Sequence, residues 1–156
     1  MVTRPSNFLQ ELSWYSVLNT LNIFVYGTLK PGELNYQRYC VQVLEAKRAI
    51  TFGKLFALPL GYPAMTSGES LVKGFLLSFT DSAILDKLDL LEGFDPSQPA
   101  AENEYNRQLI ETYNPAFVSL GLAWVYLMTP KQVHSLNGVF LPDGWWSSSG
   151  LYPFEV

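Results

Sequence analysis

A glycine turn after a short apolar run is the first feature of the sequence that could do chemistry. The run Asn22–Tyr26, NIFVY, is β-prone, and Gly27, Thr28 and Leu29 follow it directly. A turn of this kind can present successive backbone N–H groups in a concavity that binds anions or carbonyl oxygens. Many strands end in a glycine turn for steric reasons only, so the spacing by itself favours a structural role.

Glu92 is the second candidate, because it stands directly before Gly93 at the end of a helix-like stretch. A glutamate at such a helix end is usually solvated. If Glu92 instead faces a pocket, the apolar helix before it removes water from the carboxylate and raises its pKa. A general base that works near neutral pH needs such a shift, so a raised pKa is the hypothesis that we attach to Glu92.

Several common catalytic arrangements are excluded by composition and spacing. The sequence has one histidine, His134, and one cysteine, Cys40, which rules out histidine-rich metal sites, thiolate metal cages and intrachain disulfides. No serine stands in a Gly-x-Ser-x-Gly elbow, and no glycine-rich phosphate loop occurs. We interpret His134 as a surface residue and Cys40 as a buried inert thiol. We expect neither a metal nor a cofactor.

Other polar side chains could line a pocket or serve the framework. Tyr105 and Tyr126 fall in strand-like segments, where tyrosines either fill the core or face a cavity. Arg107 shares a predicted strand face with Tyr105; a structural ion pair is its more usual role, and binding of a substrate carboxylate is the alternative. We interpret Asp89 as a surface or capping group.

Five short segments, taken in chain order, match the motifs of one known family. They are Val25–Gly32 (VYGTLKPG), Gly61–Met65 (GYPAM), Leu88–Gly93 (LDLLEG), Tyr105–Arg107 (YNR) and Ala123–Tyr126 (AWVY). Together they resemble the gamma-glutamylcyclotransferase-like family, and within it the gamma-glutamylamine cyclotransferase or avirulence-induced-gene-like branch. The resemblance covers about Ile23 to Trp146.

The resemblance implies a fold, a reaction and a set of site residues. Members fold as a small mixed, mostly antiparallel β-barrel with flanking helices, and they bind a gamma-glutamyl group in a cavity at one end. The well-studied enzymes release 5-oxoproline and a free amine. Their acid–base glutamate corresponds to Glu92, and their substrate loop corresponds to Tyr26, Gly27, Thr28 and Leu29.

The motif matches also make Tyr105 and Tyr126 candidate substrate-binding residues. The glutathione-specific branch typically has serine where Thr28 stands, so the resemblance favours a gamma-glutamyl amine over glutathione.

This reaction suits residues of these types. The substrate carries its own nucleophile, the α-amine, and its own electrophile, the γ-carbonyl, and well-oriented intramolecular reactions reach effective molarities of roughly 10⁵ M or more. One carboxylate can take the proton of the α-amine and return it to the departing amine. Backbone N–H groups of the loop could stabilise the oxyanion or bind the α-carboxylate. Two alternatives remain open: a binding module with the same cavity but no turnover, and a related acyl or amide transfer.

The elements that must position these residues follow from periodicity. We predict strands at Asn22–Tyr26, Ile50–Leu58, Leu71–Phe79, Tyr105–Tyr113 and Phe117–Met128, and helices at Asn35–Ala46 and Ser82–Leu91. Strands outnumber helices without alternating with them, which favours an α+β domain on a mostly antiparallel sheet or barrel.

Capping and turn signals add detail to these elements. Asp81 is a good N-cap for the second helix, and Gly93 suits its end. Pro59–Met65 is too rich in proline and glycine for a regular element. Trp145 and Trp146, in an irregular tail, either close the cavity or bury the tail.

Length and charge set the broad class of the protein. The 156 residues divide into an N-terminal extension, 1–20, and one domain, 21–156. The 15% charged and 48% apolar content excludes a disordered chain. A net charge of −4 with dispersed Lys and Arg argues against nucleic acid. Polar residues interrupt the uncharged stretch Leu12–Leu29, which argues against a membrane span.

We therefore expect a small-molecule gamma-glutamyl substrate as the partner. The single cysteine fits a reducing compartment, and we predict a cytoplasmic protein. The sequence leaves the oligomeric state open.

Overall fold

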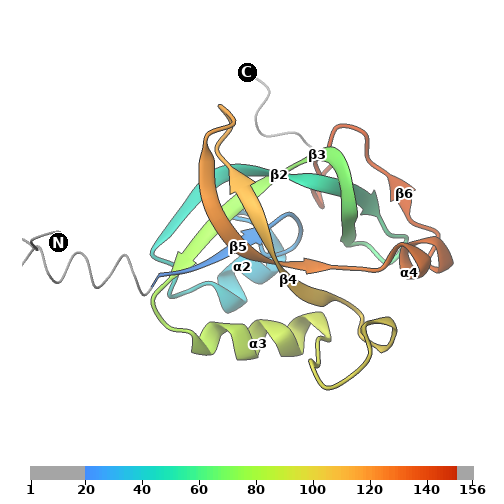
Figure 1. The fold of residues 1–156 in the computed structure, drawn as a ribbon, viewed down its shortest axis with the longest axis horizontal. Helices are drawn as coiled ribbons and strands as arrows, with labels where there is room; N and C mark the ends of the chain where they lie inside the picture. The colour runs from blue at the N-terminus through green and yellow to red at the C-terminus, as the bar shows by residue number, and fades with distance from the viewer. Residues whose placement is uncertain (1–19, 151–156) are drawn as a thin grey trace, which may run out of the picture.

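A closed barrel with helices outside it forms the framework of the computed structural model, which describes residues 20–150 (Figure 1). The predicted extension lies outside the described residues except for its last position. The strands are β1 (Leu21–Val25), β2 (Glu45–Ala57), β3 (Pro63–Phe79), β4 (Asn106–Tyr113), β5 (Ser119–Leu127) and β6 (Val139–Phe140). The helices are α2 (Leu34–Tyr39), α3 (Ala83–Glu92) and α4 (Pro130–Ser135), with a 3₁₀ turn at Ala100–Glu102.

The strand order explains how the barrel closes. The sheet runs β3-β1-β5-β4-β2-β6, and an additional pairing of β2 with β3 joins its ends. The β1–β5 pair is parallel, with Ile23 opposite Trp124, whereas the other pairs are antiparallel. The predicted α+β fold, a mixed and mostly antiparallel barrel with flanking helices, is confirmed.

The alternation of side chains along β1 separates two apolar clusters. Phe24 and Tyr26 belong to a cluster with Leu55, Val72 and Val125. The neighbouring positions Ile23 and Val25 belong to the other cluster, together with the buried side chains of α3, Ile84 and Leu88. Burying such side chains contributes about 1.5–3 kcal/mol each, so both faces of β1 hold it in place. The loop that follows β1 is therefore attached to a strand that is packed on both faces.

Helix α3 begins and ends one residue later than the predicted helix Ser82–Leu91. The predicted N-cap, Asp81, is also one residue early, because the N-cap position is Ser82; the Asp81 carboxylate nevertheless accepts a hydrogen bond from the amide of Ala83, the first helical residue, at 2.9 Å. Gly93 ends the helix in the left-handed conformation, with φ 65°. Figure 1 shows α3 running along the outside of the barrel, and its last residue is Glu92.

The predicted helix Asn35–Ala46 is wrong in its second half. Helix α2 ends at Tyr39, and β2 already begins at Glu45. The amide of Leu44 donates to the carbonyl of Ser78, next to the first rung of the β2–β3 ladder. Pairing with a distant strand has overridden a local helical spacing here. Cys40 is buried as predicted, and burial raises the pKa of its thiol to about 11.

Two strand boundaries also differ from the prediction. Pro63, Ala64 and Met65, expected to be irregular, begin β3, since a proline is tolerated as the first residue of a strand. Phe117, expected to be in a strand, instead occupies a turn with φ 63°. Within residues 20–150, no helix combines the length and apolar character that crossing a lipid bilayer requires.

Candidate active site

A cavity of about 250 Å³ brings together segments that are distant in sequence. Its walls come from the end of β1 and the loop after it, the start of α2, the start of β3, the end of α3, the residues just before β4, and β5. The lining residues are Phe24, Val25, Tyr26, Gly27, Thr28, Leu29, Asn35, Tyr62, Pro63, Leu91, Glu92, Glu104, Tyr105 and Tyr126. Ligand sites of drug-sized molecules begin at roughly 300 Å³, so the cavity suits a small molecule.

All the site residues predicted from the sequence line this one cavity. Glu92 faces it from α3, the Tyr26–Leu29 loop from the end of β1, and Tyr105 and Tyr126 from the strand side. Sequence analysis did not single out Asn35 or Glu104 as lining residues.

The loop after β1 offers amide hydrogens to the cavity. No acceptor within the described residues takes the N–H of Gly27, Thr28 or Leu29. The carbonyl of Gly27 instead accepts from the amide of Lys30 at 3.0 Å, and the carbonyl of Thr28 from the amide of Asn35 at 2.9 Å. Because a peptide unit is planar and trans, a fixed carbonyl also fixes the following N–H on the opposite side. Two of the three donors are therefore oriented before any ligand arrives.

Side-chain contacts shape the same loop. Asn35 donates from Nδ2 to Oγ1 of Thr28 at 2.9 Å, which explains why a residue of α2 reaches the cavity. Gly27 lies so close to β3 that a Cβ atom would sit 2.7 Å from Cγ of Pro63. Only glycine permits this approach, so the requirement at this position is steric.

Among the groups that line the cavity, the carboxyl of Glu92 is the one best suited to gain and lose a proton at neutral pH. It forms no hydrogen bond or ion pair with any other described residue. Burial raises its pKa to about 7, and the negative charge of Glu104 adds to the shift. The carboxyl can therefore exchange a proton readily at neutral pH.

Glu104 supplies a second carboxylate at the mouth of the cavity. Its side chain is exposed, and Oε1 accepts a hydrogen bond from the hydroxyl of Tyr62 at 2.9 Å. Among the described residues that line the cavity there is no lysine and no arginine. The carboxylates of Glu92 and Glu104 thus act on each other without a cation between them. The position of Glu104 at the end of the polar loop Asp95–Glu104 was the one signal in the sequence.

Three buried phenols line the cavity, one from the start of the loop itself and two from the segments around β4 and β5. Tyr26 donates to the carbonyl of Tyr126 at 2.6 Å, and Tyr105 donates to the carbonyl of Pro63 at 2.7 Å. The hydroxyl of Tyr126 donates to Oδ1 of Asp89 at 2.7 Å. Burial raises the pKa of all three phenols, so they remain neutral. Their protons are held by protein acceptors, which makes them rigid walls rather than proton donors to a ligand.

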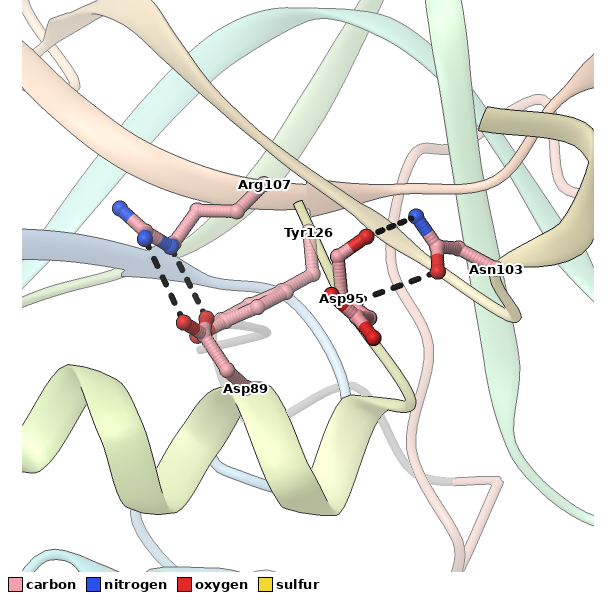
Figure 2. A network of polar contacts seen from close by, with 5 residues as sticks. All are labelled: Asp89, Asp95, Asn103, Arg107 and Tyr126. Atoms are coloured by element: carbon pink, nitrogen blue, oxygen red, sulfur yellow. Dashed lines mark hydrogen bonds and ion pairs between the residues drawn. The ribbon is translucent and has the colours of Figure 1, made fainter. Parts of the chain in front are cut away.

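An ion pair fixes the end of α3 that carries Glu92. Figure 2 shows Asp89 rising from the helix toward Arg107 of β4, with Tyr126 of β5 reaching the same carboxylate. Nε of Arg107 lies 2.9 Å from Oδ1 of Asp89, and Nη2 lies 3.3 Å from Oδ2. The structural ion pair expected for Arg107 is present. The interpretation of Asp89 as a surface or capping group is wrong, because its side chain is only 15% exposed and is shared by two strands.

The guanidinium of Arg107 also stacks against an indole. Its central carbon lies 4.3 Å from the ring centroid of Trp124. This contact holds the arginine in the plane that meets both carboxylate oxygens. Asp89 stands about one helical turn before Glu92, so this anchor fixes the part of the helix from which the Glu92 side chain projects.

A second polar clip closes the base of the loop that leads to Glu104. Asn103 accepts from the amide of Asp95 at 3.1 Å and donates from Nδ2 to the carbonyl of Asp95 at 3.1 Å (Figure 2). The same Nδ2 donates to Oδ1 of Asn106 at 3.0 Å. Because Asn103 is buried and fully engaged, the adjacent Glu104 stands at a defined position beside the cavity.

The structure is thus a small α+β protein with a closed mixed barrel, and one cavity of this barrel holds a carboxylate together with oriented backbone amides. The chain belongs to the family described as gamma-glutamyl cyclotransferase, AIG2-like, whose pattern matches residues 23–148.

Comparison with individual proteins gives the same family for the sequence and a similar fold for the structure. A gamma-L-glutamyl-butirosin B gamma-glutamyl cyclotransferase of Niallia circulans is 29% identical over 105 residues, which cover 67% of this chain and 66% of that protein. A putative gamma-glutamylcyclotransferase of Vibrio cholerae is 29% identical over 127 residues, covering 79% and 93%. The crystal structure of an AIG2-like protein from Mus musculus shares the fold, with a TM-score of 0.63 at 22% identity over 85% of this chain and 91% of that one.

Proposed function

We propose that this protein is a gamma-glutamylcyclotransferase that converts a gamma-glutamyl amine or a related small amide into 5-oxoproline and a free amine. The observation that carries the proposal is the carboxylate of Glu92, with a pKa near neutrality, in the same cavity as the unpaired amides of the Gly27 loop. Family membership supplies the reaction class.

The reaction proceeds without a covalent bond to the protein. The substrate α-amine attacks its own γ-carbonyl carbon, and its proton passes to the Glu92 carboxylate. The resulting oxyanion collapses, the bond from carbon to the departing nitrogen breaks, and Glu92 returns the proton to that nitrogen. The proton gained in the first step is the one lost in the second, so Glu92 ends as it began.

The loop and the phenols serve orientation in this scheme. The amides of Gly27, Thr28 and Leu29 are suited to the α-carboxylate or to the oxyanion, since both carry negative charge on oxygen. The rigid tyrosine wall limits the conformations of the gamma-glutamyl chain, and a curled chain has already lost the entropy that ring closure costs.

Replacement of the proposed base tests the mechanism. We expect Glu92→Gln to lower the rate of 5-oxoproline formation by about 10²- to 10⁴-fold, because the amide cannot shuttle a proton. The measurement is 5-oxoproline released from a panel of gamma-glutamyl amines, gamma-glutamyl peptides and glutathione. Glu69→Gln, an exposed glutamate outside the cavity, is the matched control.

The same experiment separates the enzyme from its rival. An unchanged rate in Glu92→Gln contradicts the mechanism. A wild-type protein that binds gamma-glutamyl compounds or 5-oxoproline in calorimetry, yet turns over no member of the panel, is instead a binding module with this cavity.

A further inference from the structure

A buried lysine directly after the substrate loop has no place in the mechanism above. Lys30 is 1% exposed and does not line the cavity. Its ammonium donates to the backbone carbonyl of Trp146. It also lies 4.1 Å from the ring centroid of Trp145 and 5.2 Å from that of Trp146. Such cation–π contacts contribute more when the cation is removed from water, as it is here.

The charge of Lys30 is unusual because it has no carboxylate partner at ion-pair distance within the described residues. Burial lowers its pKa to about 8, and the negative charge of Glu33 opposes that shift. A lysine is rarely this buried without a strong reason. The carbonyl and the two indole faces supply that reason, and all three belong to one segment near the C-terminus.

That segment, residues 141–149, is here named the C-terminal strap. It is attached to the barrel at two points: the amide of Leu141 donates to the carbonyl of Leu55, and the amide of Lys73 donates to the carbonyl of Gly144, each at 2.8 Å. The strap is therefore fixed to β2 and β3 before it meets the loop, and Lys30 is held against a firm support.

A second contact joins the strap to the same loop. The carboxylate of Glu33 accepts from the hydroxyl of Ser148 at 2.6 Å and from its amide at 3.3 Å. Lys30 and Glu33 stand three residues apart, and the amide of Glu33 donates to the carbonyl of Lys30 at 3.0 Å. The contacts of Lys30 and Glu33 with the strap thus hold the turn formed by residues 30–33 at its first and last residue.

The geometry points to Lys30 as a positioning residue that clamps the substrate loop to the C-terminal strap and so aims the loop amides into the cavity. Its own amide donates to the carbonyl of Gly27, and that carbonyl shares a planar peptide unit with the N–H of Thr28. Movement of Lys30 therefore rotates a cavity donor directly. The clamp itself is independent of the reaction; only its effects on 5-oxoproline binding and on turnover rest on the proposed function.

Lys30→Met tests the clamp, because methionine keeps an unbranched chain of similar length but has neither charge nor donor. We expect amide hydrogen exchange, followed by NMR, to accelerate at least tenfold at residue 30 and at Asn35, whose amides donate to the carbonyls of Gly27 and Thr28. The amide of Met128, bonded to the carbonyl of Met65 in the barrel, serves as the internal reference. Lys47→Met, at an exposed lysine on β2, is the matched control.

Ligand binding supplies a readout that a general loss of stability does not move. We expect Lys30→Met to weaken 5-oxoproline binding about tenfold at a temperature where the exchange of Met128 is unchanged. Where turnover is measurable, KM rises more than kcat falls, and the pKa of Glu92 stays where it is. Equal loop exchange and equal affinity in Lys30→Met and Lys47→Met overturn the proposal.

Two further outcomes remain decisive. If Lys30→Met does not fold, Ser148→Ala removes the hydroxyl donor, the shorter of the two hydrogen bonds in the second contact, and keeps the backbone amide of residue 148; it should accelerate exchange at the amide of Glu33, and no acceleration there rejects the clamp. If the wild-type protein turns over no substrate, the proposed function fails, while the exchange rates still decide on the clamp.

Discussion

Two properties of Glu92 in the cavity act in the same direction on its protonation. It is a carboxylate without a partner among the described residues, and burial together with a second carboxylate favours its protonated form. Burial and the charge of Glu104 both destabilise the ionised carboxylate of Glu92, which raises its pKa. A carboxylate with a higher pKa is a stronger base. The basicity of Glu92 thus arises because no described residue pairs with its carboxylate.

The pH dependence of the site follows from these two causes. The pKa of Glu92 in the ligand-free protein should be about 7 in a carboxyl NMR titration, and kcat/KM should fall as the pH drops below it, because the protonated carboxyl cannot accept the α-amine proton. Glu104→Gln removes the second cause and should move the titration to lower pH. Titration of the substrate affects the rates of wild type and Glu104→Gln equally. A difference between their pH–rate profiles therefore reports a difference between the two proteins.

Glu69→Gln changes the net charge by the same amount away from the cavity and should leave the titration in place. A titration of Glu92 near 4.5, or one that Glu104→Gln does not move, contradicts this account of the cavity.

At the scale of the element, one ion pair fixes the end of α3 that carries Glu92. Asp89→Asn keeps an acceptor for the hydroxyl of Tyr126 but removes the charge that Arg107 faces in a half-buried position. We expect a loss of about 1–3 kcal/mol in the free energy of unfolding, because the guanidinium remains without its partner. We also expect turnover to fall about ten- to a hundredfold, since the end of the helix carries Glu92.

Urea unfolding and steady-state kinetics measure the two effects. Asp86→Asn, an exposed position on the same helix, should change both by little. If Asp89→Asn matches that control, the ion pair does not hold the helix.

The sequence predicted those elements whose signals are local. Helix α3 has an apolar face, a terminal glycine and an aspartate at its start within a single stretch; the helix forms one residue later than predicted, with Gly93 at its end and Asp81 accepting a hydrogen bond from its first residue. The stretch after Tyr39 had a helical spacing but forms a turn and then β2, since its partner strand lies far along the chain. The identity of a strand partner is not contained in the periodicity of one segment.

The candidate site shows the same difference: residues within motifs could be predicted from the sequence, whereas contacts between distant segments could not. Family motifs placed the loop, Glu92 and the two tyrosines in one site, and the structure brings them to one cavity. The partners of Asp89 and Lys30 come from β4, β5 and the C-terminal strap, and no spacing rule connects them. Glu104 lies at the cavity because its neighbour, the buried Asn103, bonds to Asp95 and because its own amide donates to the carbonyl of Gly93, and neither contact follows from periodicity.

At the scale of the whole molecule, the raised pKa of Glu92 is also a statement about stability. Between the ordinary pKa of a glutamate and about 7, the folded protein binds a proton that the unfolded chain does not. The stabilising effect is complete at low pH and is lost as the pH rises through 7. Wild-type protein at pH 8 therefore carries a cost that an uncharged side chain at this position avoids.

Glu92→Gln should consequently be more stable than wild type at pH 8, by about 1–3 kcal/mol, and the difference should disappear by about pH 4.5. Denaturant unfolding at several pH values measures it. Equal stability of the two proteins at pH 8 would mean that the carboxylate is well solvated, and the base assigned to the reaction would lose its physical basis.

The parallel pairing of β1 with β5 has a consequence for the order in which the protein folds. Tyr26 bonds through its hydroxyl to the carbonyl of Tyr126, 100 positions later, and β1 lies against β5 over the same stretch. Contacts between such remote parts of a chain are slow to form, since most of the chain must be ordered before they contribute. A ribosome has therefore released most of the polypeptide before β1 finds its second neighbour. We expect the cavity to be among the last parts of the molecule to form, so a nascent chain lacking β5 has the loop but no binding site.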